Sequence, residues 1–243
     1  MIKNTASLIL MLCLLNACKK DPVTKPVNFT TTSYQSLNTF DDVGKPSNLL
    51  KDTIPAGMIN FIDSILPNGQ NLTISHPEFF SGKLIADVAV TQTSDVYITF
   101  VTEDGGSKNS IAFYTYPTNQ PPLSAKDIQL ITYVFPNAGN LTPLNPGDKA
   151  KLGTFNAGTS IGFVLMQNAW DPIKKTMNND AVHFASNDVL NPEVDPKLKK
   201  HAVLINYAPE NKILVGFEDY DRTQAGCDND FNDVVIYATI VKK

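Results

Sequence analysis

The sequence is poor in several residue types that mark common classes of protein. Its 243 residues include one arginine (Arg222), one tryptophan (Trp170), three histidines and three cysteines. Three cysteines cannot build a disulfide-rich scaffold, and a single arginine is unlike a protein that binds nucleic acid through clustered basic residues. With 20 basic and 24 acidic residues, the formal net charge of −4 also argues against that class. The 42% of hydrophobic residues is enough for a globular core and excludes global disorder.

The N-terminal apolar run is also short. It covers residues 8–15, whereas a transmembrane helix needs about 20 apolar residues. A short apolar run behind the basic Lys3 is typical of a secretory signal peptide, which we predict at residues 1–17.

Residues 15–18 read Leu-Asn-Ala-Cys, which resembles the lipobox of bacterial lipoproteins. This resemblance implies that Cys18 becomes the acylated first residue and anchors the chain to a lipid bilayer. The following Lys19-Lys20-Asp21 is similar to the charged export tag of surface lipoproteins in Bacteroidetes-like bacteria. We therefore expect a lipid-anchored outer-membrane protein exposed at the cell surface. A periplasm-facing anchor, and plain secretion after cleavage near Ala17, are the alternatives.

The remaining chain divides into a polar segment and a folded region. Residues 18–45 are rich in Lys, Thr, Ser, Asn and Pro, which predicts a lipidated flexible tether. Apolar residues between Pro55 and Leu66 have helical spacing, with Pro55 at the first turn. After about residue 84, short apolar segments alternate with turn residues. We expect strands at residues 84–90, 96–101, 111–116, 128–135, 161–166, 202–207, 213–217 and 234–241.

Many short strands without intervening helices favour one all-β domain over residues 46–243. The predicted fold is a β-sandwich, jelly-roll-like, with one short N-terminal helix.

Six acidic residues crowd the segment between the last two predicted strands, with Arg222 as the only basic residue among them. They are Glu218, Asp219, Asp221, Asp228, Asp230 and Asp233. Crowded carboxylates repel one another unless a cation joins them, and the flanking strands fix both ends of the segment. Asp228, Asp230 and Asn232 also have the i, i+2, i+4 spacing of the first half of an EF-hand loop. The central glycine and the distant glutamate of that loop are missing.

This pattern predicts a site for a hard divalent cation. Carboxylate and amide oxygens, without histidine or cysteine, favour Ca²⁺ over zinc or copper. The candidate metal ligands are Glu218, Asp219, Asp228, Asp230, Asn232 and Asp233, with Glu103, before a Gly-Gly turn, as an additional candidate. The alternative is a solvated acidic hairpin without metal, because Asp and Asn are common in turns.

The same segment carries a family resemblance. Gly-Phe-Glu-Asp at residues 216–219 and Asp-Asn-Asp-Phe-Asn-Asp-Val-Val at residues 228–235 resemble the signature of the LruC-type domain, a bacterial family of unknown function. Residues 100–105, 109–116 and 144–148 are similar to earlier blocks of that family. The resemblance implies an exported or lipid-anchored β-domain, often attached to cell-surface proteins, with a calcium site. It implies no biochemical activity.

Two catalytic patterns are present but incomplete. Residues 158–162 match the G-x-S-x-G pattern around Ser160, and Asp188 or Asp195 and His201 follow in hydrolase order. A nucleophile elbow needs a helix after the serine, whereas a strand is predicted there. Paired carboxylates can cleave glycosidic bonds, but the acidic residues here share one loop.

We therefore expect a calcium-binding lipoprotein that is not an enzyme and acts as a structural, adhesion or ligand-binding module. Its ligand would be a glycan or a protein, and not nucleic acid. A surface hydrolase acting on glycans or esters, and a metal-free structural lipoprotein, are the alternatives.

Overall fold

The computed structural model describes residues 29–81 and 87–243. The predicted signal peptide, Cys18 and the first part of the predicted tether lie outside these ranges. Within the described ranges no helix combines the length and the hydropathy needed to cross a membrane.

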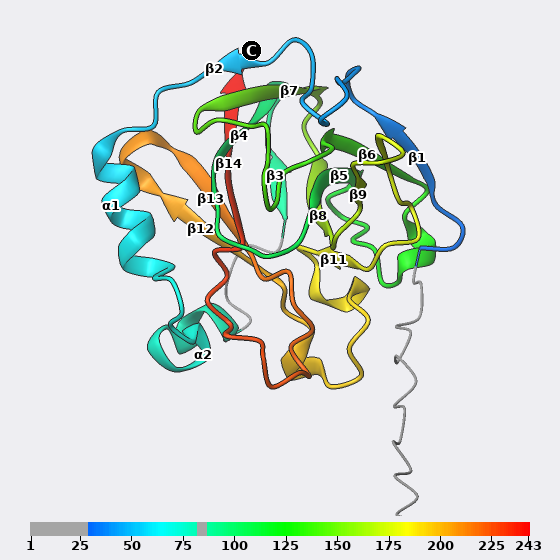
Figure 1. Ribbon diagram of the computed structural model, residues 1–243. Helices are drawn as coiled ribbons and strands as arrows, with labels where there is room; N and C mark the ends of the chain where they lie inside the picture. Colours follow the sequence, from blue (N-terminus) through cyan, green and yellow to red (C-terminus); the bar gives the residue numbers. More distant parts are fainter. Residues whose placement is uncertain (1–28, 82–86) are drawn as a thin grey trace, which may run out of the picture.

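The described residues form fourteen strands in three sheets, and two six-stranded sheets pack into a sandwich (Figure 1). The first sheet has the order β1 (Ser33–Ser36), β6 (Leu130–Phe135), β5 (Ser110–Pro117), β8 (Thr159–Met166) and β11 (His183–Ala185), and β3 (Val88–Val90) also pairs with β8. The second has the order β12 (Ala202–Tyr207), β13 (Lys212–Phe217), β14 (Val234–Lys242), β4 (Ser94–Glu103), β7 (Asp148–Phe155) and β2 (Leu50–Lys51). β9 (Trp170–Asp171) and β10 (Thr176–Met177) form a small ribbon. The predicted all-β sandwich is confirmed.

Helical structure is minor. It consists of α1 (Ala56–Ile65), α2 (Leu72–Ser75) and 3-10 turns at Pro77–Phe80, Ala125–Asp127, Asp188–Leu190, Pro196–Leu198 and Ala208–Glu210. The predicted helix between Pro55 and Leu66 agrees with α1, whose N-cap is Pro55. The expected strands are present, although the predicted strand at residues 84–90 is described only from Val88.

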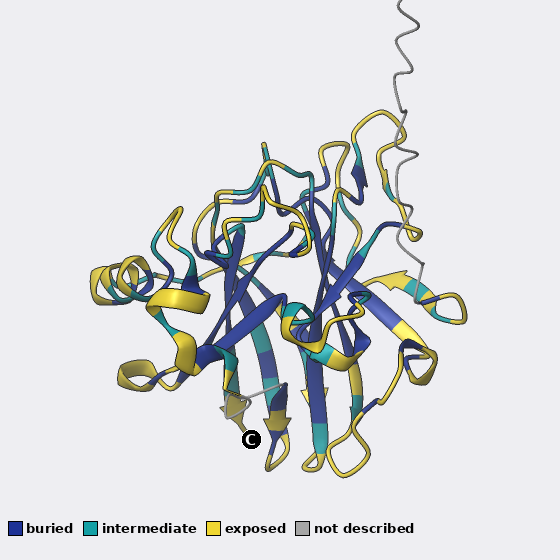
Figure 2. Cartoon of the chain, turned by 90° about the horizontal axis from the view of Figure 1, so that it is seen from below, coloured by how far each residue is buried: buried dark blue, intermediate teal, exposed yellow. Residues whose placement is uncertain are grey.

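The main core lies between the two sheets. Because successive strand residues point to opposite faces, Val96, Ile98 and Phe100 of β4 all enter this core. They pack with Phe163 of β8 and Phe217 of β13. Figure 2 shows these buried strands in the interior, with the exposed residues on the loops and turns around them.

A second apolar cluster fixes α1 against the outer face of the second sheet. Met58, Ile62 and Leu66 follow one another at intervals of four residues and therefore share one face of the helix. They are buried with Leu214 and Tyr237 of the sheet. This contact places the C-terminal end of α1 beside the end of the sandwich where the acidic segment lies (Figure 1).

The structure corrects the predicted tether. Ser33–Ser36 form β1, which pairs in parallel with β6, and Phe29 is buried in the cluster on the outer face of the first sheet. The tether prediction rested on polar composition, which does not reveal an edge strand whose partner lies about 100 residues away. The boundary at residue 46 is therefore too late, and residues 29–45 belong to the folded domain.

The docking of α1 gives a direct test of the second cluster. Met58→Ala should lower the free energy of unfolding by about 2–5 kcal/mol, because Met58 is 0% exposed and its removal leaves a cavity. Ile59→Ala, on the same helix but 37% exposed, should cost less than about 1 kcal/mol. Urea denaturation of both variants provides the measurement. Equal losses for the two would contradict the observed orientation of α1.

Candidate metal centre

The acidic segment at residues 218–233 joins β13 to β14 at one end of the sandwich (Figure 1). β13 and β14 are antiparallel, and Phe217 pairs with Val234. Glu218 and Asp233 therefore leave the sheet from directly opposite positions. The segment cannot move its two ends apart to relieve the repulsion between its carboxylates.

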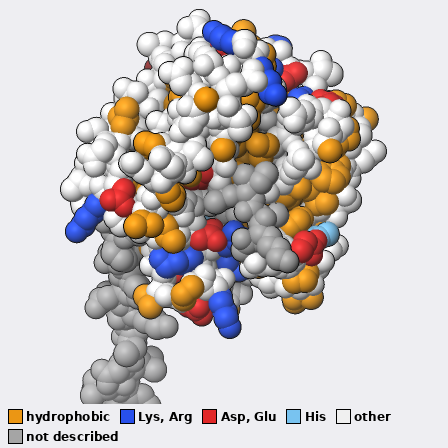
Figure 3. All heavy atoms as spheres, turned by 180° about the vertical axis from the view of Figure 1, so that it is seen from behind, with side chains coloured by type: hydrophobic (Ala, Val, Ile, Leu, Met, Phe, Trp, Pro, Cys, Tyr) orange, Lys and Arg blue, Asp and Glu red, His pale blue; other side chains and the backbone are white. Residues whose placement is uncertain are grey.

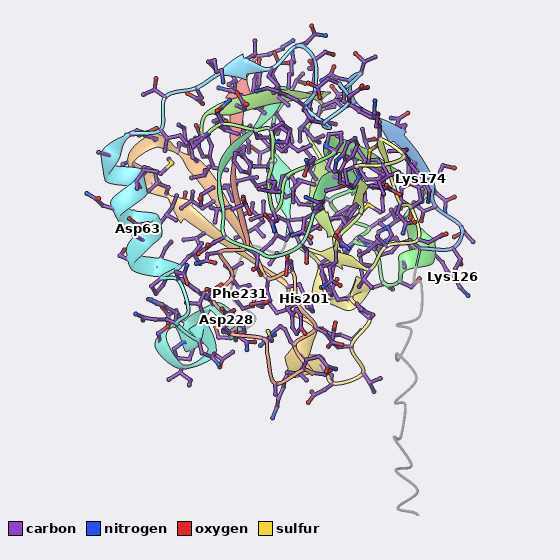
Figure 4. All side chains as sticks on the ribbon, in the orientation of Figure 1. Asp63, Lys126, Lys174, His201, Asp228 and Phe231 are labelled. Atoms are coloured by element: carbon purple, nitrogen blue, oxygen red, sulfur yellow. The ribbon has the colours of Figure 1, made fainter. Side chains whose placement is uncertain are left out.

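Three of the predicted ligands form a cage. Glu218, Asp228 and Asp230 each present a carboxylate oxygen, and these oxygens all lie within 4.8 Å of one another. Glu218 and Asp230 are buried, whereas Asp228 is exposed and closes the cage from the solvent side. Figure 4 labels Asp228 next to Phe231, below the sheet and beside α2.

Glu218 has an unusual environment. It is 1% exposed, and its Oε1 accepts a long hydrogen bond of 3.3 Å from the backbone of Tyr220. Its Oε2 is buried without any nitrogen or oxygen donor within hydrogen-bonding distance. The thiol of Cys227 also contacts the carboxyl, but a thiol is a weak donor. Burial, followed by the charge of Asp228, raises the pKa of Glu218 to about 7.

Asp230 is held in place by the backbone. Its Oδ2 accepts a hydrogen bond of 2.7 Å from the amide of Gly69, and its Oδ1 accepts one of 3.2 Å from the amide of Asn232. Burial is the main reason why the pKa of Asp230 is raised. The segment after α1 therefore orients a carboxylate of the cage, through a contact that spans 161 residues.

Arg222 stabilises the loop without neutralising the cage. Its Nε donates to Oδ1 of Asn229 at 2.6 Å, and its guanidinium lies beside the contacting rings of Phe80 and Phe231, at 5.3 and 5.5 Å from their centroids. Its Nη1 donates to the backbone carbonyls of residues 197 and 200. No ion pair joins Arg222 to a cage carboxylate among the described residues. Arg222 therefore interacts with Glu218 only over a longer distance and leaves the oxygens of the cage without a basic partner.

Asp219 and Asp233 form a second pair beside the cage. Oδ2 of Asp233 accepts a hydrogen bond of 2.7 Å from the amide of Asp219, and Oδ2 of Asp219 accepts one of 2.6 Å from Asn109. Burial, and then the charge of Asp219, raise the pKa of Asp233 to about 9. Gly105 packs against both, because a Cβ there would lie 2.9 Å from Asp219 and 3.2 Å from Asp233.

The remaining predicted ligands lie next to the cage. Asn232 and Glu103 line a pocket between α1 and the end of β4. The pKa of Glu103 is raised by burial and then by the neighbouring charges of Asp104 and Asp219. Sequence reasoning missed the amide of Gly69, because no local pattern signals a donor so distant along the chain.

Ser160 and His201, from the serine-hydrolase pattern, and the single tryptophan are all buried. Ser160 is a buried residue within β8, where its hydroxyl lies 2.9 Å from the hydroxyl of Thr118, so the strand continues through the position where an elbow would turn. Nδ1 of His201 donates to the backbone carbonyl of Glu218 at 3.1 Å, and its ring stacks on Phe184. Trp170 is buried against Phe40, which fits a residue that caps the core.

The described surface shows no large basic area on the face in Figure 3. Lys and Arg side chains form small separate groups there, among neutral and hydrophobic side chains. This distribution agrees with the low arginine content of the sequence.

Comparison with known proteins identifies a domain but no activity. Residues 155–240 match a family described as "Domain of unknown function (DUF4114)". The matched region runs from the end of β7 into β14 and contains the whole acidic segment. No curated protein and no solved structure matches the chain. The match shows a domain of unknown function and does not extend to the LruC-type assignment.

The raised pKa of Asp233 predicts how stability depends on pH when no divalent cation is present. The folded chain holds a proton on Asp233 up to about pH 9, whereas the unfolded chain loses it near pH 4. Stability should therefore fall as pH rises between these values. The window from pH 7 to 8.5 is best for the measurement, because below it the buried His183, with its pKa lowered to about 4, acts in the opposite direction.

Urea denaturation in chelator at pH 7 and 8.5 measures this slope. Asp233→Asn should flatten it, because asparagine stays neutral. Asp180→Asn should leave it unchanged, since Asp180 is exposed in a distant loop. A slope that survives Asp233→Asn would assign the effect to other groups.

Proposed function

We propose that the protein is a membrane-anchored lipoprotein whose β-sandwich binds calcium, and that it acts as a structural, adhesion or ligand-binding module at the cell surface. The observation that carries the calcium assignment is the buried carboxyl of Glu218. Its Oε2 has no hydrogen-bond partner, and one of its oxygens lies within 4.8 Å of oxygens of Asp228 and Asp230. An unsatisfied buried oxygen costs about 1–3 kcal/mol, and more when the group is charged. A bound cation removes that cost.

The chemistry of the cage favours Ca²⁺. Its ligands are oxygens only, and Ca²⁺ accepts six to eight oxygens in flexible geometry. Mg²⁺ requires a tighter octahedron and keeps several waters, whereas zinc and copper prefer imidazole or thiolate. The exposed position of Asp228 leaves room for water to complete the coordination.

Calcium would act on the fold and not on a bond of a substrate. The cage connects the end of β13 to the loop before β14, and these strands lie side by side within the second sheet. Neutralising its carboxylates removes repulsion that the folded state otherwise carries. The serine pattern gives no support for hydrolysis, because the Ser160 hydroxyl is paired with Thr118 inside a strand.

Calcium should raise the melting temperature of the chelator-treated protein, and chelator should lower it again. At a calcium concentration about 100-fold above Kd, the expected gain in stability is about 2.7 kcal/mol. Glu218→Gln and Asp230→Asn should reduce or abolish the calcium-dependent shift, whereas the exposed Asp180→Asn should keep it. Differential scanning calorimetry measures the shift, and elemental analysis after dialysis without chelator identifies the ion.

A melting temperature that does not respond to calcium or to chelator would exclude the stabilising role. The metal-free alternative makes the opposite prediction for the variants. In that case Asp230→Asn would leave stability unchanged or raise it, because a repulsive charge is lost.

The membrane anchor rests on the sequence at Cys18. Cys18→Ser should move the protein from the membrane fraction to the soluble fraction. The variant lacks the residue that would carry the acyl chains, and it is these chains that would bind the protein to the bilayer. Cys227→Ser should leave it in the membrane, since this cysteine belongs to the folded domain. Mass spectrometry of the N-terminal peptide should detect acyl groups on Cys18. Protease treatment of intact cells then separates cell-surface display from a periplasm-facing anchor.

A further inference from the structure

A pocket of about 490 Å³ lies beside the cage, between the C-terminal half of α1 and the end of β4. α1 contributes Ile62, Asp63 and Leu66 to it, and the end of β4 contributes Glu103 and the adjoining Asp104. Asn232, from the acidic segment, completes the wall. Figure 4 labels Asp63 on the lower half of α1, on the side of the molecule where Asp228 lies.

Acidic side chains line the pocket, and the basic Lys108, which acts on Glu103 from outside the lining, only partly offsets their charge. Asp63, Glu103 and Asp104 all line it, and no lysine, arginine or histidine does. Within residues 29–81 and 87–243, none of these three carboxylates forms an ion pair. The same end of the domain also carries the carboxylates of the cage and of the Asp219–Asp233 pair. The pocket is therefore placed to attract a cation.

An independent observation concerns Asn232. It is only 8% exposed, yet its side-chain amide forms no hydrogen bond with any described residue, and only its backbone amide is bonded, to Asp230. Its side-chain polar atoms are not among the fully enclosed ones that lack a partner, so they remain accessible, and a ligand in the pocket can bond to them. Its amide oxygen can accept a hydrogen bond from a donor in the pocket.

The α1 side of the pocket also carries apolar side chains beside Asp63. Ile62 and Leu66 are buried on the inner face of α1, and both line the pocket. A small hydrated metal ion gains nothing from these side chains, whereas an aliphatic chain is stabilised by each CH₂ group that it buries against them. The acidic and the apolar side chains together match a ligand that has a positive head and an aliphatic stem.

We propose that this pocket binds an alkylammonium group, as carried by a lysine side chain of a partner protein or by a free diamine. The ammonium group lies among Asp63, Glu103 and Asp104 and donates a hydrogen bond to the amide oxygen of Asn232. The methylene stem lies against Ile62 and Leu66. The pocket is separate from the cage, because none of its three carboxylates belongs to the Glu218–Asp228–Asp230 group.

The experiment titrates the purified full chain, in non-ionic detergent and with saturating calcium, with Nα-acetyl-lysine N-methylamide. Isothermal titration calorimetry measures Kd, and NMR shifts locate the contact. The norleucine analogue has the same stem without the charge and should not bind. Glu103→Gln should weaken binding of the lysine derivative at least tenfold. Asp180→Asn removes one exposed negative charge elsewhere and should change Kd less than twofold.

A second variant protects the test against misfolding. Asp63→Asn changes an exposed helix residue, so the variant should keep the wild-type melting temperature and still bind more weakly. Cadaverine distinguishes the two sources of the group. Tighter binding of the diamine supports a free diamine ligand, and tighter binding of the lysine derivative supports a lysine of a protein partner.

Three results would overturn the proposal: no binding of either amine, equal binding of the norleucine analogue, or a Kd unchanged by both Glu103→Gln and Asp63→Asn. Displacement of the amine by calcium, with loss of calcium binding in Glu103→Gln, would also overturn it, since the pocket would then be a metal site. Repeating the titration in chelator separates this proposal from the calcium cage. Amine binding can fail while the calcium-dependent melting shift remains, and the reverse can also occur.

Discussion

The antiparallel pairing of β13 with β14 is the constraint on which this end of the molecule depends. It brings Glu218 and Asp233 to opposite positions at the strand ends, and the fourteen residues between them must return within that distance. A free acidic loop would relieve its repulsion by spreading into water. Here the strands are buried in the centre of the second sheet, so the carboxylates remain close and the electrostatic cost remains in the folded state.

Contacts outside the acidic segment determine how its carboxylates are positioned. The apolar face of α1 holds the helix on the sheet, and this contact brings Gly69 to Asp230 and opens the pocket beside Asn232. Arg222, packed beside two aromatic rings, fixes the loop through Asn229. The cage and the pocket therefore share one supporting framework, although their carboxylates differ. A change in α1 acts on both, whereas a change in Glu103 acts on the pocket alone.

The sequence predicted those features that depend on local patterns. Alternating apolar residues located β4, β8 and β14, and helical spacing located α1, because each pattern reflects the burial of a single face. The clustering of Glu218, Asp228 and Asp230 followed from spacing and from the flanking strands. β1 was missed because a polar edge strand has no periodicity, and the role of Gly69 was missed because its contact joins distant parts of the chain. Asn109 was a weaker candidate for reaching the acidic segment, and its amide donates to Asp219. The separation of Asn232 and Glu103 from the cage likewise depends on where α1 docks.

Three groups of carboxylates lie at one end of the domain, and they differ in burial and in the hydrogen-bond donors around them. In the Asp219–Asp233 pair, backbone and amide donors occupy two oxygens, and the raised pKa of Asp233 favours a proton. In the cage, a buried oxygen of Glu218 has no donor, and the oxygens converge closely enough for one metal ion. In the pocket, Asp63 and Asp104 are exposed and Glu103 is half-buried, and the buried Ile62 and Leu66 line the same space. The donors and the space around each oxygen thus differ among the three groups, and these differences are the basis of the proposed metal and amine sites.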